Sequence, residues 1–129
     1  MEIWAPGLEI VIDSGGKGHF KQVTTGKSGN FSISSTEFSE LRRRTEPFRL
    51  SPETITAGQL SEKNLNDSWR CDGNYVTDNG SISFHWIGPS LDQFYFVDFG
   101  CDREKNAARN QTLHAVLASL PVPAPDSWP

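Results

Sequence analysis

The sequence has no long hydrophobic run, since no stretch approaches the 18 consecutive apolar residues of a membrane-spanning helix. It also has no excess of basic residues, because 12 Lys+Arg stand against 16 Asp+Glu and give a net charge of −4. Proteins that coat nucleic acid are usually basic. Residues 1–6 lack the basic start and the apolar stretch of a signal peptide. We therefore expect no membrane span and no nucleic-acid binding, and the acidic balance suits a basic partner.

Motifs for catalysis and cofactor binding are also missing. The sequence contains no G-x-S-x-G, no H-E-x-x-H and no EF-hand loop. Thr25-Gly26-Lys27-Ser28 looks like the end of a phosphate-binding loop, but Lys21 stands where that loop needs its first glycine. No C-x-x-C is present and no histidine has zinc-finger spacing. The sequence therefore predicts neither a metal site nor a cofactor.

Cysteine is scarce, with only Cys71 and Cys101. An even count in a small acidic chain fits one disulfide in an oxidising compartment, and both cysteines lie at the edges of segments rather than inside apolar runs. We predict that the two are bonded and that the protein is periplasmic or secreted. The alternatives are two unrelated buried thiols, or a catalytic cysteine for which the sequence fixes no histidine as a base.

The 129 residues, with a mass of 14.3 kDa, are the size of one domain. We predict a single domain over residues 1–129, with its core within 8–120. Residues 49–80 are rich in turn formers and predict a long irregular excursion, and residues 121–129 form a proline-rich tail.

Alternating apolar residues predict strands in two blocks. In the first block, glycine-rich turns separate three strands at Leu8–Asp13, His19–Thr24 and Phe31–Ser34. In the second block, Ser81–Ile87 alternates strictly. Gln93–Phe99 is apolar on both faces, which indicates a central strand covered on both sides.

A helix is expected after each block. Ser34 and Glu37 have the spacing of a capping box, and apolar residues follow at helical spacing. In the second block, Leu113, Val116 and Leu117 share one helical face, and the helix stops before the tail. The sequence thus predicts an α+β fold, a mostly antiparallel sheet of about five strands with two helices packed on one face. The predicted order is β-β-β-α-loop-β-β-α.

The candidate binding surface comprises the excursion 49–80 and the sheet face that carries His85. Trp69 lies in that excursion, and an exposed tryptophan anchors an interface, stacks on a sugar, or folds back over the core. Two further candidates in the excursion are Tyr75 and Asp78.

Charged residues offer further candidates. Asp98 interrupts an aromatic run, so it needs a partner, for which Arg70, Arg103 or a backbone donor are available. Pairing with Asp13 as acid and base is the functional alternative. The only basic cluster is Arg42-Arg43-Arg44 with Arg49, which forms either a solvated helix face or a site for an acidic group or phosphate.

Several of these segments together resemble an uncharacterised bacterial domain found in exported proteins and lipoproteins. The resemblance rests on Tyr75-Val76-Thr77-Asp78 before the Ser81–Ile87 strand, the Leu8–Val23 hairpin and the Ser34–Arg44 helix, and it covers most of residues 8–120. The cysteines and the excursion 49–74 are not part of it. The resemblance implies the fold and an extracytoplasmic location, and it brings no established activity.

We expect a non-enzymatic protein-binding module outside the cytoplasm, of the inhibitor, immunity or accessory type. One alternative is a small hydrolase-like enzyme that uses Asp98 or Asp13 with His85. Another is a carbohydrate-binding module that uses Trp69. A deep pocket lined by His85 and Asp98 would favour the enzyme, whereas a flat apolar patch would favour a protein partner.

Overall fold

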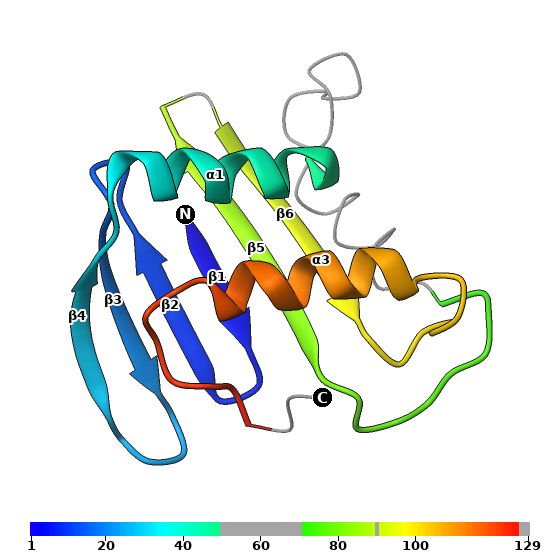
Figure 1. Cartoon of the computed structure of the whole chain (residues 1–129). Helices are drawn as coiled ribbons and strands as arrows, with labels where there is room; N and C mark the ends of the chain where they lie inside the picture. Colours follow the sequence, from blue (N-terminus) through cyan, green and yellow to red (C-terminus); the bar gives the residue numbers. More distant parts are fainter. Residues whose placement is uncertain (50–70, 90, 127–129) are drawn as a thin grey trace.

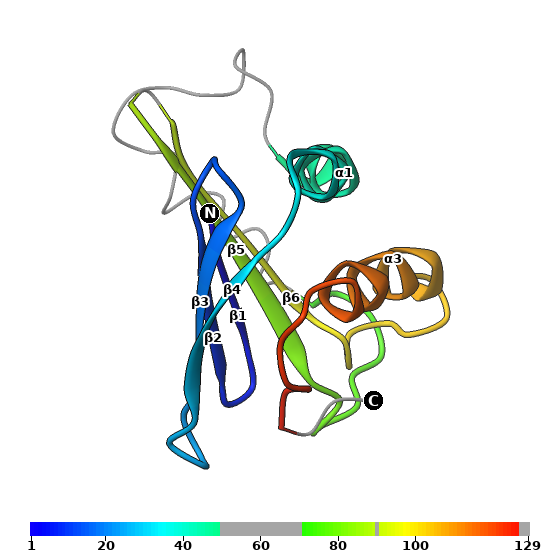
Figure 2. The same cartoon turned by 60° about the vertical axis from the view of Figure 1, so that its left-hand side comes forward.

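The computed structural model describes residues 1–49, 71–89 and 91–126. Six strands form one antiparallel sheet in the order β4-β3-β2-β1-β5-β6. Two helices lie side by side on one face of this sheet (Figures 1 and 2). The elements are β1 (Glu2–Ala5), β2 (Leu8–Ile12), β3 (Lys17–Gln22), β4 (Ser28–Ser32), α1 (Ser35–Thr45), the 3-10 helix η1 (Glu46–Phe48), β5 (Ser81–Gly88), β6 (Leu91–Asp98) and α3 (Ala107–Ala118). The predicted α+β fold is confirmed, with six strands where about five were expected.

The additional strand, β1, lies inside the sheet between β2 and β5. Its Ile3 faces Ile10 on one side and Phe84 on the other, and it is fully buried. A two-residue turn, Pro6-Gly7, joins β1 to β2, and Gly7 has a φ of +69°, which glycine adopts readily. The hydrophobic core therefore includes Ile3, upstream of Leu8, where we expected it to start.

The core fills the space between the sheet and the two helices. Alternate residues of the central strands point toward the helices, which is the consequence of the two-residue period of a strand. Leu41 of α1 and Leu113, Val116 and Leu117 of α3 face them. The buried strand residues are Ile3, Leu8, Ile10, Ile12, Ile82, Phe84, Trp86, Gln93 and Val97.

The predicted capping box begins α1. The Glu37 N–H donates to Ser34 Oγ at 3.1 Å, and the Ser34 N–H donates to Glu37 Oε2 at 2.6 Å. The predicted second helix is also present as α3, after Asn106. The Asn106 side chain donates to the carbonyl of Cys101 at 3.0 Å and makes no capping hydrogen bond.

Three strand predictions need correction. β3 covers Lys17–Gln22, so it begins and ends two residues before the expected His19–Thr24. β4 begins at Ser28, three residues before the expected start at Phe31, because the turn from β3 is shorter than its composition suggests. β6 lies at an edge of the sheet and not at its centre. Both faces of β6 carry apolar residues, but each face packs against different neighbours. Tyr95 stacks on Phe48 on the side of the helices, and Phe94 stacks on His85 on the opposite side.

The segments outside the sheet and helices are held by a few contacts. Of the excursion 49–80, residues 50–70 lie outside the described residues, and residues 71–80 form one isolated bridge, between Tyr75 and Cys101. The proline-rich tail is described as far as Asp126. It folds back on the β1–β2 turn, where the Asp126 N–H donates to the Pro6 carbonyl at 2.8 Å.

Candidate functional site

No described helix or strand covers the second face of the sheet (Figure 2). We call it the open face, and it faces away from α1 and α3. It carries the side chains that alternate with the buried core residues. On β1, β2, β5 and β6 these include Glu2, Trp4, Glu9, Val11, Ser83, His85, Ile87, Asp92, Phe94 and Phe96.

Three large apolar side chains on the open face are half-exposed. Trp4 is 53% exposed, Val11 50% and Ile87 52%. The register places Trp4 beside Ser83, which in turn faces Phe96, so Trp4 and Phe96 lie two strands apart, about 10 Å. Trp4 and Phe96 therefore lie on the same face with Ser83 between them, and no described helix or strand covers them.

His85 occupies the centre of this surface. Its ring stacks on Phe94, with centroids 3.7 Å apart and planes inclined by 16°. Its Nδ1 lies 3.2 Å from Glu2 Oε2, and its Nε2 lies 2.7 Å from Asp92 Oδ1. A carboxylate only accepts hydrogen bonds, so both nitrogens donate only when the ring carries both protons. The two carboxylates leave the trio with a net negative charge on the open face.

Charge is divided between the two halves of the open face. The β1, β5 and β6 half carries the carboxylates of Glu2 and Asp92, whereas the outward residues of β3 include Lys17 and Lys21. The aromatic side chains Trp4, Phe94 and Phe96 lie in the acidic half. That half therefore combines the two features that attract a cation, namely negative charge and aromatic rings.

Tyr75 and Asp98 form a second cluster at the edge of the sheet. The Tyr75 hydroxyl donates to Asp98 Oδ2 at 2.8 Å, and this hydrogen bond to a carboxylate raises the pKa of Tyr75. The Gly100 N–H donates to Asp98 Oδ1 at 2.8 Å. The partner of Asp98 thus includes a backbone donor, one of the expected alternatives. Asp78 is exposed and has a φ of +58°.

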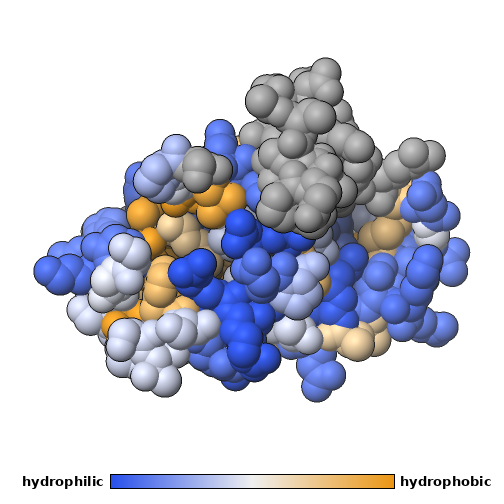
Figure 3. All heavy atoms as spheres, turned by 90° about the horizontal axis from the view of Figure 1, so that it is seen from above, coloured by the Kyte–Doolittle hydropathy of each residue, from blue (hydrophilic) through white to orange (hydrophobic). Residues whose placement is uncertain are grey.

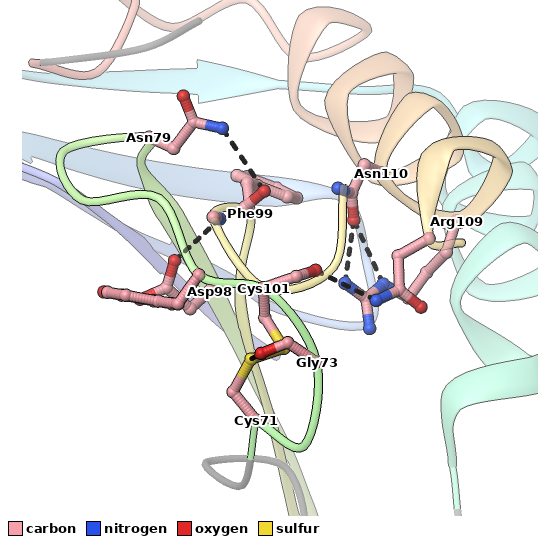
Figure 4. The surroundings of a disulfide bond; sticks show 11 residues. Cys71, Gly73, Asn79, Asp98, Phe99, Cys101, Arg109 and Asn110 are labelled. Atoms are coloured by element: carbon pink, nitrogen blue, oxygen red, sulfur yellow. Dashed lines mark hydrogen bonds between the residues drawn. A yellow bond between two sulfur atoms is a disulfide. The ribbon is translucent and has the colours of Figure 1, made fainter. Parts of the chain in front are cut away.

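A disulfide joins the segment of Tyr75 to the turn after β6 (Figure 4). Cys71 and Cys101 are bonded, with Cα atoms 5.7 Å apart, which confirms the predicted pair. Backbone bonds continue the attachment, since the Val76 N–H donates to the Gly100 carbonyl at 2.9 Å and the Asp102 N–H to the Asn74 carbonyl at 2.6 Å. A bonded pair is typical of a non-reducing compartment.

Beside the disulfide lies a cavity of about 750 Å³ between residues 74–79, the turn 99–104 and the start of α3. Asn110 and His114 of α3 line it together with Phe99, whose ring centroid lies 4.3 Å from that of His114. Burial lowers the pKa of His114. Figure 4 shows Asn110 turning its side-chain oxygen toward Arg109, which donates to it at 2.9 and 3.1 Å. Neither His85 nor Asp98 lines this cavity.

The structure does not bring together the residues on which the hydrolase alternative depends. Asp98 faces Ser81 in the β5–β6 register, whereas His85 faces Phe94. Four residues of strand, about 13 Å, separate the two positions. Asp13 caps the β2–β3 turn, where it accepts the N–H groups of Gly15 and Lys17 at 2.9 and 3.0 Å.

Other expectations meet the structure only in part. Trp69 lies outside the described residues, so the carbohydrate alternative has no geometry here. Within residues 1–49, 71–89 and 91–126, no group of three His, Cys, Asp or Glu residues is arranged to hold a metal ion. No helix in the same ranges is long and apolar enough to span a membrane.

Glu2, Trp4 and Asp92 were not among the site residues predicted from the sequence. A signal for the first two was present, because Ile3 alternates with Glu2 and Trp4 and Pro6-Gly7 is a turn signature. Asp92 had no such signal, since its pairing with His85 follows from the hairpin register.

Compared with protein-family models, with curated proteins and with solved structures, the chain matches none.

Proposed function

We propose that this chain binds a basic protein outside the cytoplasm through the acidic aromatic half of the open face. It acts there by contact, as an inhibitor, an immunity protein or an accessory domain. The observation that carries the proposal is the sheet face that no described helix or strand covers, on which half-exposed Trp4 lies beside the Glu2–His85–Asp92 trio.

Trp4 supports this proposal through its exposure and its place. Tryptophan is the residue type most enriched among those that dominate binding energy at protein interfaces. Trp4 sits in an inner strand, and its neighbour Ile3 is fully buried, so the ring is presented on a rigid element. A rigid anchor loses little conformational freedom on binding.

Charge supports a basic partner. The chain has a net charge of −4, and the carboxylates of Glu2, Glu9 and Asp92 lie around Trp4 and His85 on the open face. Complementary charge accelerates encounter and selects against acidic competitors. Aromatic rings next to carboxylates also suit the side chains of lysine and arginine.

The location outside the cytoplasm rests on two supports. The Cys71–Cys101 disulfide suits the periplasm or the extracellular space. The resemblance to a domain of exported proteins and lipoproteins implies the same compartments.

Site-specific photo-crosslinking in the native cell envelope tests the proposal. A benzophenone side chain replaces Val11, on the open face, and in a matched variant it replaces Ala108, exposed on α3. We expect the variant at position 11 to crosslink one basic protein that the variant at position 108 does not. Identical products from both positions, or no product from position 11, would contradict the proposal.

A further inference from the structure

A second cleft lies on the helix side of the molecule, between α1, η1 and the ends of β2, β5 and β6. Its volume is about 540 Å³, which suits a small molecule. In a view from above, where α1 lies, the surface is mostly hydrophilic and hydrophobic residues gather in its left-hand part (Figure 3). The apolar residues that line the cleft include Met1, Phe38, Trp86, Leu91 and, from the open face, Ile87.

Two of the four arginines of the basic cluster line this cleft, and the other two lie outside it. Arg43 and Arg44 both bind Glu40, at 2.7 and 2.9 Å, on the exposed side of α1. Arg42 and Arg49, by contrast, line the cleft. Among the described residues, Arg42 has no acidic partner within ion-pair distance.

Arg49 has unused hydrogen-bond donors. Its Nη1 donates to both carboxylate oxygens of Glu46, at 3.0 and 3.2 Å. Its Nε is buried and has no acceptor among the residues that the structure describes. In a guanidinium group, Nε and Nη2 point the same way and together form the fork that grips a carboxylate with two parallel hydrogen bonds. Glu46 binds only Nη1, so Nε and Nη2 have no acceptor among the described residues.

The acidic residues of the cleft are already engaged. Asp13 accepts two backbone N–H groups of the β2–β3 turn, and Glu46 holds Arg49 Nη1. A buried N–H without an acceptor is unfavourable, and a ligand carboxylate supplies that acceptor. The apolar walls suit a hydrocarbon or aromatic body attached to the carboxylate.

We propose that this cleft binds a small amphiphilic monocarboxylate. Its carboxylate is held by the guanidinium groups of Arg49 and Arg42, and its apolar body lies against Phe38 and Trp86. This site lies on the helix side of the sheet and shares only Ile87 with the named open-face residues, so the inference does not depend on the proposed protein binding.

Titration calorimetry with octanoate, below its critical micelle concentration, tests the proposal, with octan-1-ol as the matched neutral probe. We expect saturable binding of octanoate at least tenfold tighter than that of octan-1-ol. Nuclear magnetic resonance should show the Arg49 Nε–H and the Trp86 indole N–H shifting together. Equal affinity for the two probes would overturn the proposal, and this comparison uses only the unaltered protein.

Arginine variants assign the site. Arg49→Gln and Arg42→Gln should each weaken octanoate binding about tenfold, with little change for octan-1-ol. Arg43→Gln removes the same charge from the exposed side of α1 and should leave the affinity unchanged. An equal loss in Arg43→Gln would show general attraction of anions and would contradict a site built on Arg42 and Arg49.

Discussion

The imidazole of His85 lies flat on the ring of Phe94, 3.7 Å away between centroids, across the last two strands of the sheet. The same imidazole links Glu2 of β1 to Asp92 of β6. These contacts connect three neighbouring strands on the open face and hold the edge strand β6 against the rest of the sheet.

A double-mutant cycle between His85→Ala and Phe94→Ala should show a coupling free energy of about 0.5–1.5 kcal/mol, the range for stacked rings. Urea unfolding of the four proteins measures it. The cycle of His85→Ala with Lys21→Ala is the control, because Lys21 lies three strands from His85. A coupling no larger than in the control would mean that the stacked rings contribute nothing to stability.

The Cys71–Cys101 disulfide closes a segment with a sequence separation of 30 residues. The chain-entropy relation gives a contribution of about 3.5–4 kcal/mol for a loop of this length. We expect the double variant Cys71→Ala/Cys101→Ala to lose about that much free energy of unfolding in urea. Reductant should lower the stability of the unaltered protein by a similar amount and leave the double variant unchanged. A loss below about 1 kcal/mol would argue against this role.

Ile3 tests the place of β1 inside the sheet. Ile3→Ala should lower the free energy of unfolding by about 2–5 kcal/mol, because it leaves a cavity among Ile10, Phe84 and the helices. Val11→Ala, on the open face, should cost less than about 1 kcal/mol. Equal effects in urea unfolding would mean that β1 is not an inner strand.

His114 gives the protein a defined pH dependence. Burial lowers its pKa from the usual 6.5, so the folded protein keeps the ring neutral where the unfolded chain already takes up a proton. As far as His114 determines it, stability is therefore greatest above about pH 6.5 and falls as the pH drops toward the folded-state pKa of this ring. The difference in unfolding free energy between about pH 7.5 and about pH 5 should be smaller in His114→Gln than in the unaltered protein. The same difference in both proteins would contradict the assignment.

Local sequence signals predicted most of the strands and both described helices, but they did not predict where each strand lies in the sheet. The capping box of Ser34 and Glu37 and the alternation of Ser81–Ile87 specify their elements without tertiary information, and both predictions are confirmed. β1 was missed although Pro6-Gly7 marks its turn, because four residues give little periodicity. β6 was predicted to be a central strand because both of its faces are apolar. The sequence alone does not show whether the second apolar face is covered by a core or, as here, lies on the open face.

The candidate site was harder to predict than the fold. His85 was placed correctly opposite the apolar side of its strand. Its partners Glu2 and Asp92 come from strands whose register is a property of the whole sheet. The disulfide could be predicted because two cysteines allow only one pairing.

The central claim is that Trp4 anchors a protein partner. The most direct test is the affinity of the crosslinked partner for Trp4→Ala, with Val23→Ala as the control. Val23 is 54% exposed, close to the 53% of Trp4, but lies in the β3–β4 turn. We expect Trp4→Ala to weaken binding at least tenfold, about 1.4 kcal/mol, with little change in Tm, and Val23→Ala to bind as the unaltered protein does. Unchanged affinity in Trp4→Ala would contradict the account.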